Sequence, residues 1–345
     1  AAATGGFTSV ACMPNTSPVN DNRAITEFIR RQASDCGLTN VYPIAAITEG
    51  SKGEQLADLR DLKDAGAVAF SDDGLPVMDA ALMRRALEQA ASLNVPIIEH
   101  CEDRNLSMGG VMHEGAVSRE IGVPGIPGIA EEVMVARNIL LAEFTGAPLH
   151  IAHVSTAGSV RLIREAKARG IRVTAETAPH YFTLTDEAVR TLDTATRVNP
   201  PLRSEKDRAA IREGLRDGTI DAIASDHAPH APQDKEVDFS RAASGITGLE
   251  TSLSLSLRLV SEGIFSLSQL IEKMTILPAR ILRIPKGTLA EGADADITVI
   301  DPERKWSVDR GSFRSRGKNT PFQGWTLKGK AVLTIMGGGI RYRDF

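Results

Sequence analysis

The chain has 345 residues, 42% of them hydrophobic and 4% aromatic, and its 40 basic and 44 acidic residues give a net charge of -4. This balance argues against nucleic acid or an anionic membrane as the main partner, and aromatic side chains that could stack on bases are few. No apolar stretch is long enough to cross a membrane. The three cysteines, Cys12, Cys36 and Cys101, lack metal-site or redox spacing, which favours a reducing cytoplasm over a disulfide scaffold.

Short apolar runs alternate with amphipathic segments along most of the chain. The apolar runs suit buried strands and the amphipathic segments suit helices. Strands are predicted at 7–13, 41–47, 67–70, 96–98, 149–152, 171–174 and 220–224, and a long glycine-rich loop is predicted at 101–128. Strict alternation indicates parallel strands joined by crossover helices. We therefore expect an α/β fold, a (β/α)8 TIM-like barrel whose first strand is missing.

The opening residues support this expectation. Ala1 to Gly6 resembles the last turn of a helix with its glycine cap, without an initiator Met or a signal peptide. An eighth strand upstream of Ala1 would close the barrel. The competing prediction is a doubly wound open sheet, which would gather ligand residues at one switch point instead of at four successive strand ends.

The pattern changes near Ile284, where helical spacing ends. Strands are predicted at 295–300, 331–336 and 340–342, and Asp301-Pro302 is expected to break the first of them. We therefore expect two domains, a barrel over residues 1–283 and a small β-sandwich-type domain over residues 284–345.

Four apolar runs end in a residue that can bind a metal: Asp73, His100, His153 and Asp226. Strand ends of a barrel lie close together, and two imidazoles with two carboxylates suit zinc, which lowers the pKa of a bound water to about 7. A nearby carboxylate can accept the proton of that water and pass it to a leaving nitrogen, and Asp226 fits this catalytic role best. Asp72 competes with Asp73, and spacing alone does not separate the two.

The other histidines receive separate predictions. His150 is expected to face the helices, and His113 to be solvated in a polar loop. His227 should point away from the site, because side chains alternate along an extended chain. His180 follows a proline at a strand end and is a candidate for shaping the site.

Eight short motifs then occur in a fixed order. They are Met13-Pro-Asn-Thr16, Phe70-Ser-Asp-Asp-Gly74, Glu99-His-Cys-Glu102, His150-Ile-Ala-His-Val-Ser155, Val198-Asn-Pro-Pro-Leu-Arg203, Ser225-Asp-His-Ala-Pro-His230, Gly245-Ile-Thr-Gly-Leu-Glu250, and Lys318-Asn-Thr-Pro-Phe322 with Gly324-Trp325. One such motif is weak evidence, whereas the ordered set is specific. With these motifs, the whole chain resembles the dihydroorotases of the amidohydrolase superfamily, in particular the bacterial type that stands as a separate polypeptide.

The resemblance implies a metal site. His100 and His153 would hold one zinc ion, Asp73 would bridge two, and Asp226 would bind the other and act as general base and acid. Many relatives use a carboxylated lysine as the bridge. No lysine occurs at 71–74, so that modification is not expected here.

The resemblance also implies a small-molecule substrate. The reaction would be the reversible cyclisation of N-carbamoyl-L-aspartate to dihydroorotate in pyrimidine synthesis. Asn15 and His230 would bind the substrate carboxylate, Asn199 the carbamoyl or ring amide, and the backbone at Ser244-Gly245 the ring. A homodimer or a complex with aspartate transcarbamoylase is the assembly that the resemblance suggests.

One family motif is absent. The His-x-His-Leu-Arg motif, which supplies two zinc ligands and an arginine, belongs on the first barrel strand and would lie upstream of Ala1. We therefore expect the sequence as given to bind at most one zinc firmly and to be inactive.

Two other functions are possible on the same residues. An allantoinase or hydantoinase would share the fold and chemistry, but the carboxylate-binding pair Asn15 and His230 argues against it. A non-catalytic subunit that scaffolds aspartate transcarbamoylase would have no need to keep the metal-binding residues.

Overall fold

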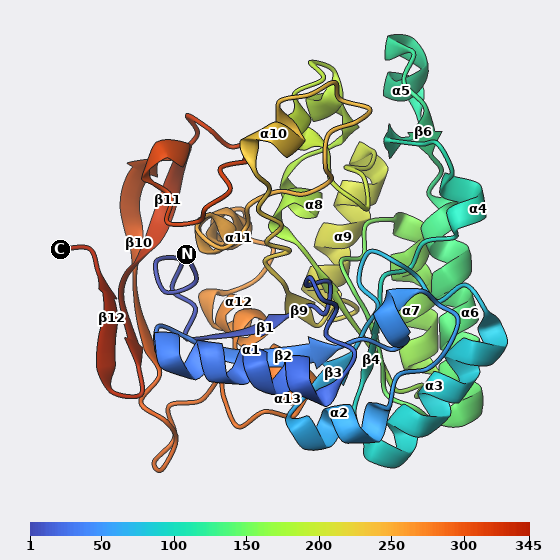
Figure 1. Ribbon diagram of the computed structural model, residues 1–345. Helices are drawn as coiled ribbons and strands as arrows, with labels where there is room; N and C mark the ends of the chain where they lie inside the picture. Colours follow the sequence, from blue (N-terminus) through green and yellow to red (C-terminus); the bar gives the residue numbers. More distant parts are fainter.

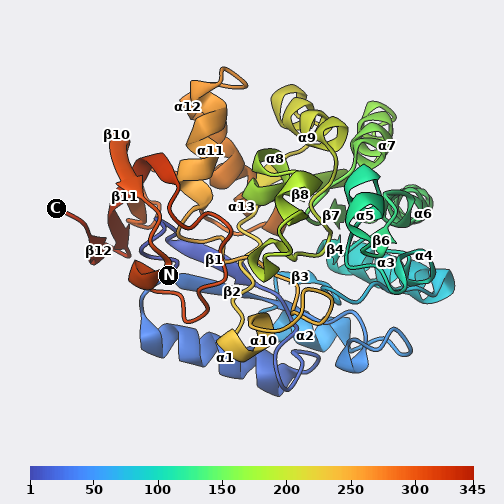
Figure 2. The ribbon, with the colours of Figure 1, turned by 90° about the horizontal axis from the view of Figure 1, so that it is seen from above.

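The computed structural model describes residues 1–345 and is built around a parallel sheet of seven strands. Their hydrogen-bonded order is β1 (Ser9–Cys12), β2 (Asn40–Ala45), β3 (Ala69–Phe70), β4 (Ile97–Glu99), β7 (Leu149–Ile151), β8 (Val173–Thr177) and β9 (Ala222–Ile223). All seven predicted strands are confirmed. The sheet curls into an open barrel whose end strands, β1 and β9, do not pair with each other (Figures 1 and 2).

Helices surround the outer face of this sheet, as the view from above shows (Figure 2). They are α1 (Arg23–Cys36), α2 (Leu59–Ala65), α3 (Ala80–Leu93), α6 (Ile129–Thr145), α7 (Ala157–Ala168), α9 (Glu205–Asp217), α11 (Ser252–Ser261), α12 (Leu267–Met274) and α13 (Ile276–Leu282). Asp79 caps α3, because its carboxylate accepts hydrogen bonds from the amides of Ala81 and Leu82. No helix combines the length and the apolar character that a membrane crossing needs.

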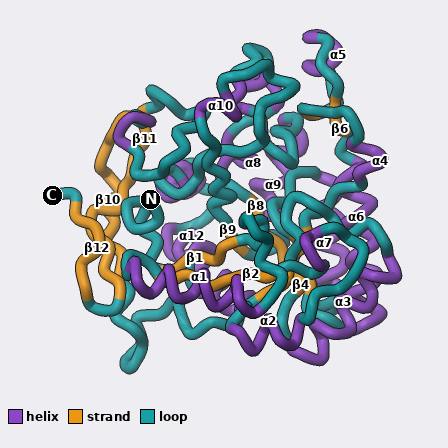
Figure 3. Tube along the Cα trace, in the orientation of Figure 1, coloured by secondary structure: helices purple, strands orange, loops and turns teal.

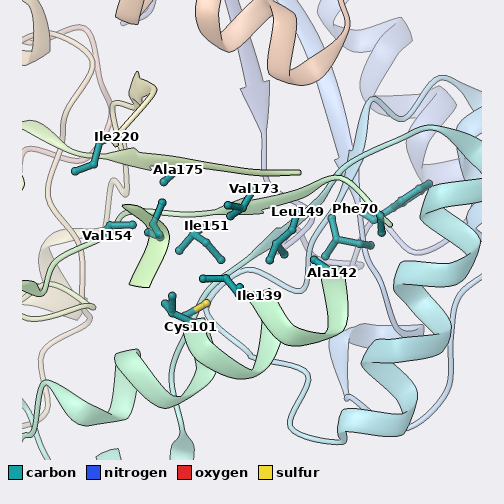
Figure 4. Close-up of a cluster of buried hydrophobic side chains, with 14 of the residues drawn as sticks. Phe70, Cys101, Ile139, Ala142, Leu149, Ile151, Val154, Val173, Ala175 and Ile220 are labelled. Carbon is teal, nitrogen blue, oxygen red and sulfur yellow. The ribbon is translucent and has the colours of Figure 1, made fainter. Parts of the chain in front are cut away.

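The strands pack on both faces, because successive side chains point to opposite sides. Ile97 belongs to the large core cluster between sheet and helices, together with Leu149 and Ile151, and Figure 4 shows the last two packed against α6. Ile98 and Ala152 belong to a separate small cluster on the inner face of the sheet. Large apolar side chains therefore fill the outer layer and leave room for polar groups inside the barrel.

The segment 101–128 is more ordered than the predicted loop. It contains α4 (Arg104–Ser107), β5 (Met112–His113), α5 (Ala116–Ile121) and β6 (Gly125–Ile126), and β5 pairs with β6. Two further short helices, α8 (Pro179–Thr183) and α10 (Pro232–Lys235), follow β8 and β9. These short elements lie at the end of the barrel where the strands terminate (Figure 1).

The C-terminal part forms the predicted small sheet. Its antiparallel strands are β10 (Ile297–Ser307), β11 (Thr326–Met336) and β12 (Gly339–Arg343), shown in orange at the edge of Figure 3. The expected break at Asp301-Pro302 is wrong: β10 continues past it, and the pairing with β11 shifts register between Asp301 and Lys305. Such a bulge accommodates the missing amide of proline without ending the strand.

This small sheet packs on α11 through Gly329. The Gly329 carbonyl accepts hydrogen bonds from the Ser254 hydroxyl and from Trp306 Nε1, the latter at 3.2 Å. Gly329 has φ +87°, and a Cβ there would lie 2.2 Å from Leu257 Cδ1. The contact therefore needs a residue without a side chain.

We predict that Gly329→Ala lowers the free energy of unfolding by about 2–4 kcal/mol, because it adds a clash with Leu257 to the cost of a positive φ. Gly337→Ala is the matched control, since Gly337 has φ +57° and no atom within 4 Å of its added Cβ. Chemical denaturation measures both variants. Equal losses would show that the α11 contact is not responsible.

Candidate active site

The ends of the parallel strands gather the predicted metal-binding residues. Asp73 follows β3, His100 follows β4, His153 follows β7 and Asp226 follows β9. Asp73, His153 and Asp226 line one cavity of about 950 Å³, and His100 lies directly behind His153. Because all strands run in the same direction, residues far apart in sequence meet at one end of the barrel.

Asp73, His100 and His153 form the tightest cluster. Their ligand atoms all lie within 4.8 Å of one another, and His100 Nδ1 is 2.9 Å from His153 Nε2. Both imidazoles are buried, and His153 Nδ1 has no hydrogen-bond partner. Two imidazoles and a carboxylate that converge in this way fit a divalent cation.

The structure separates Asp72 from Asp73. Asp72 is buried and accepts hydrogen bonds from the Ile47 amide (2.8 Å), the Thr48 amide (3.0 Å) and the Thr48 hydroxyl. Asp73 points instead into the cavity, where Asn15 Nδ2 donates to its Oδ2 at 2.8 Å. Asp72 therefore holds the backbone after β2, and Asp73 is the carboxylate available to a metal.

Asp226 lines the same cavity as Asp73 and His153 and has His180 as its neighbour. His180 Nε2 is 3.3 Å from Asp226 Oδ2. Asp226 (φ +45°) and His153 (φ +33°) both adopt left-handed backbone conformations that are uncommon for residues other than glycine. Such a conformation costs on the order of 1–3 kcal/mol and persists where the surrounding structure enforces it, typically at functional sites.

The protein environment shifts the pKa values of these groups in different directions. Burial raises the pKa of Asp73 and lowers that of His153. Burial also opposes ionisation of Asp226, but the adjacent His180 holds the pKa of Asp226 below its ordinary value. Asp226 is thus kept as the ionised carboxylate, the form that can accept a proton.

His100 has a second partner, Glu102. The Glu102 carboxylate lies 2.8 Å from His100 Nε2 and also accepts a hydrogen bond from Asn199 Nδ2 at 2.8 Å. Burial alone would lower the pKa of His100, but the hydrogen bond to Glu102 raises it above the ordinary value. Burial likewise opposes ionisation of Glu102, but its contacts with His100 lower the pKa of Glu102 to about 2. A carboxylate behind a metal-binding imidazole orients the ring and increases its basicity.

The predicted substrate-binding residues surround this centre in two groups. Asn15 and His230 line the cavity. Asn199, Ser244 and Gly245 do not line it: Asn199 contacts Glu102, and the Ser244 carbonyl lies 2.8 Å from His230 Nε2. His230 and the Ser244–Gly245 backbone are therefore neighbours.

Two predictions about other histidines are wrong. His150 faces the barrel interior instead of the helices: it lines the cavity, and its Nε2 lies 3.3 Å from Glu176 Oε2. Its strand neighbours Leu149 and Ile151 take the outer face, so alternation points His150 inward. His113 is half-buried in β5, 3.4 Å from Arg203 Nη1, and burial lowers its pKa to about 4.

The sequence analysis does not identify two residues that hold site residues in place without lining the cavity, Glu102 and Asn319. Glu102 lies within the quoted Glu99-His-Cys-Glu102 motif, which was the available signal. Asn319 lies far away in sequence, yet its side chain accepts from the His230 amide (2.9 Å) and donates to the Ala228 (2.9 Å) and Gly245 (3.0 Å) carbonyls. Its motif, Lys318-Asn-Thr-Pro-Phe322, carries no spacing that indicates such a contact.

We predict that Asp72→Ala lowers the free energy of unfolding of the metal-free protein by about 1–3 kcal/mol, because it leaves buried amides without an acceptor. Asp73→Ala should change stability little and abolish tight metal binding. Chemical denaturation and metal analysis after dialysis measure the two properties. Metal loss in Asp72→Ala with full retention in Asp73→Ala would reverse the assignment.

Known proteins match the chain in sequence. The dihydro-orotase-like family model matches residues 1–159, and a model described as amidohydrolase family matches residues 135–342. The dihydroorotase of Syntrophus aciditrophicus (strain SB) is 64% identical over 344 residues, which cover 100% of this chain and 81% of that protein. The dihydroorotase of Pelotomaculum thermopropionicum is also 64% identical, with 100% and 81% covered.

Solved structures match the fold. The L-hydantoinase (dihydropyrimidinase) from Arthrobacter aurescens superimposes with a TM-score of 0.87 at 28% identity, over 99% of this chain and 78% of that one. A dihydropyrimidinase from Brevibacillus agri NCHU1002 gives a TM-score of 0.84 at 22% identity, with 99% and 78% covered. Full-length identity of 64% to dihydroorotases, together with the match to the amidohydrolase model, shows that the chain belongs to the dihydroorotase family of amidohydrolases.

Proposed function

We propose that this chain is a dihydroorotase, which interconverts N-carbamoyl-L-aspartate and dihydroorotate. The observation that carries the proposal is that Asp226 lines the same cavity as Asp73 and His153, which cluster with His100. The adjacent His180 keeps the pKa of Asp226 below its ordinary value. That arrangement supports hydrolysis of an amide at a metal centre. The 64% identity to dihydroorotases supports the choice of substrate.

Zinc is the proposed metal. Asp73, His100 and His153 would hold it, and Asp226 would serve a second ion together with Asp73. When bound, zinc lowers the pKa of water and polarises a carbonyl. The orphaned Nδ1 of buried His153 and the short distance between the two imidazoles support this donor set.

Asp226 would move the proton. In the hydrolytic direction a water oxygen adds to the ring carbonyl carbon, and Asp226 accepts the proton that the water loses. The bond from that carbon to the ring nitrogen then breaks, and Asp226 returns the proton to the nitrogen. In the synthetic direction the same carboxylate takes the proton from the attacking nitrogen. The low pKa that His180 confers keeps Asp226 ready to accept it.

Substrate selection would rest on the groups around the cavity. Asn15 and His230 are proposed to bind the carboxylate of dihydroorotate, Asn199 its amide, and the Ser244–Gly245 backbone its ring. A hydantoinase activity is the alternative that the structural neighbours raise. A hydantoin or dihydropyrimidine ring without a carboxylate would make no use of the proposed carboxylate-binding pair Asn15 and His230, which favours dihydroorotate.

The remaining proposals concern organisation. We propose a domain boundary at 283/284, supported by the end of α13 at Leu282 and the start of β10 at Ile297. A homodimer or a complex with aspartate transcarbamoylase, and a cytoplasmic location, stay predictions. The expected inactivity of the chain finds no support in the comparisons, and the assays below measure it directly.

We predict that Asp226→Asn in the full chain lowers the turnover number for dihydroorotate by about a hundredfold to ten-thousandfold, because the variant loses its general base and acid. The free energy of unfolding should stay close to that of the wild type. Steady-state kinetics of the zinc-loaded protein, with metal content determined in parallel, provide the measurement. Turnover within about threefold of the wild type would remove Asp226 from this role.

We predict that His230→Ala raises the KM for dihydroorotate by about 10- to 150-fold, because it removes a charge-assisted contact of roughly 1.5–3 kcal/mol. The KM for dihydrouracil, a ring amide without the carboxylate, should change little. Measuring both substrates with the wild type also tests the function itself. Faster wild-type hydrolysis of dihydrouracil or hydantoin than of dihydroorotate would favour a hydantoinase, and equal KM effects would remove His230 from carboxylate binding.

A further inference from the structure

The backbone that follows Asp226 runs alongside a second segment, residues 246–249. His227 and Ile246 form a parallel β-bridge, and the Ala228 amide donates to the Ile246 carbonyl at 3.0 Å. This second segment directly continues the Ser244–Gly245 backbone. The proposed general base and the proposed ring-binding backbone are therefore attached to each other immediately beside the cavity.

The side chain of His227 makes the central connection between the two segments. Its Nδ1 lies 3.1 Å from the Gly248 amide and 3.3 Å from the Leu249 amide, and both donate to it. An imidazole nitrogen that accepts from two amides carries no proton, so the hydrogen of the ring resides on Nε2. Nε2 lies 3.3 Å from the Ser315 hydroxyl. One ring nitrogen thus satisfies two adjacent backbone donors.

The two segments also touch at Gly248, where no space is left for a side chain. A Cβ on Gly248 would lie 1.9 Å from the Ser225 carbonyl oxygen, so the backbones are in direct contact next to Asp226. Asp226 itself holds a φ of +45°. A strained conformation persists only where neighbouring contacts enforce it, and the contacts of His227 are the ones immediately after it in sequence.

We propose that His227 is a positioning residue: through its unprotonated Nδ1 it joins residues 248–249 to the end of β9 and so fixes Asp226 relative to the Ser244–Gly245 backbone. The kinetic part of this inference rests on the proposed function, whereas its structural part does not. Because both ring nitrogens already have partners, His227 acts through Asp226 and not by contact with the reacting atoms.

Two substitutions separate positioning from other roles. In His227→Asn, Oδ1 occupies nearly the position of Nδ1 and can still accept from the Gly248 and Leu249 amides. His227→Leu fills similar space without an acceptor. Ser315→Ala is the matched control, because it removes the partner of Nε2 and leaves Nδ1 unchanged. Circular dichroism and thermal melting check that each variant is folded.

Hydrogen exchange followed by mass spectrometry on peptides covering 244–251 gives the readout that does not depend on activity. His227→Leu should exchange the Gly248 and Leu249 amides at least about tenfold faster than the wild type, the factor that corresponds to the loss of one net hydrogen bond. His227→Asn and Ser315→Ala should exchange like the wild type. Wild-type exchange in His227→Leu, or fast exchange in both His227 variants or in Ser315→Ala, would overturn the proposal.

Dihydroorotate turnover gives the second readout. The turnover number of His227→Leu should fall by up to about a hundredfold, the effect of a misplaced catalytic group, and His227→Asn should recover most of it. If His227→Asn restores protection of the amides but not turnover, the imidazole itself takes part in chemistry and the positioning role is wrong. Absence of wild-type turnover would refute the proposed function, and the exchange comparison would still decide the role of His227.

Discussion

The register of the parallel strands is the constraint on which the candidate site depends. In β4 and β7, one set of side chains packs against the helices and the alternate set faces the barrel interior. A slip of one residue in either strand would exchange these sets, so that Ile98 would face the helices and Leu149 the interior. The outer core therefore does more than stabilise the fold, because its packing determines where His100 and His153 emerge at the strand ends.

Gathering so many ionisable groups in one place opposes folding, and the structure compensates for some of these groups more than for others. The Glu102 carboxylate lies 2.8 Å from His100 Nε2, and His180 Nε2 lies 3.3 Å from Asp226 Oδ2, so two of the four groups have an adjacent polar partner. Asp73 has only the neutral amide of Asn15, and burial raises its pKa. This uneven compensation leaves Asp73 as the carboxylate that gains most from a bound cation, whereas Asp226 is stable as an ion without one.

Much of this arrangement was predictable from the sequence, and the exceptions have physical reasons. Runs such as 149–152 identify strands because buried parallel strands are continuously apolar, and they place His153 at a strand end. They do not reveal which face the polar residue within the run occupies, and for this reason the expectation that His150 faces the helices is wrong. Spacing alone does not show which of Asp72 and Asp73 is the candidate metal ligand, because the chain turns there. The hydrogen bonds from the amides of residues 47 and 48 to Asp72 decide it, since they leave Asp73 as the carboxylate in the cavity. Contacts such as that of Asn319 depend on how distant segments pack, which no local pattern encodes.

The C-terminal part is an example of such packing between distant segments. Its sequence pattern indicates a separate sheet, but some of its residues form hydrogen bonds with the loops of the candidate site. Asn319 binds the His230 amide and the Gly245 carbonyl, and the Glu250 carboxylate accepts from the amides of Arg314 and Ser315. Each of these contacts joins residues 314–319 to the loops that follow β9. The loops that would select the substrate are thus held from two directions, by the barrel strand on one side and by the C-terminal segment on the other. A change in that segment can therefore alter substrate binding without touching the cavity, because it moves the backbone that presents His230.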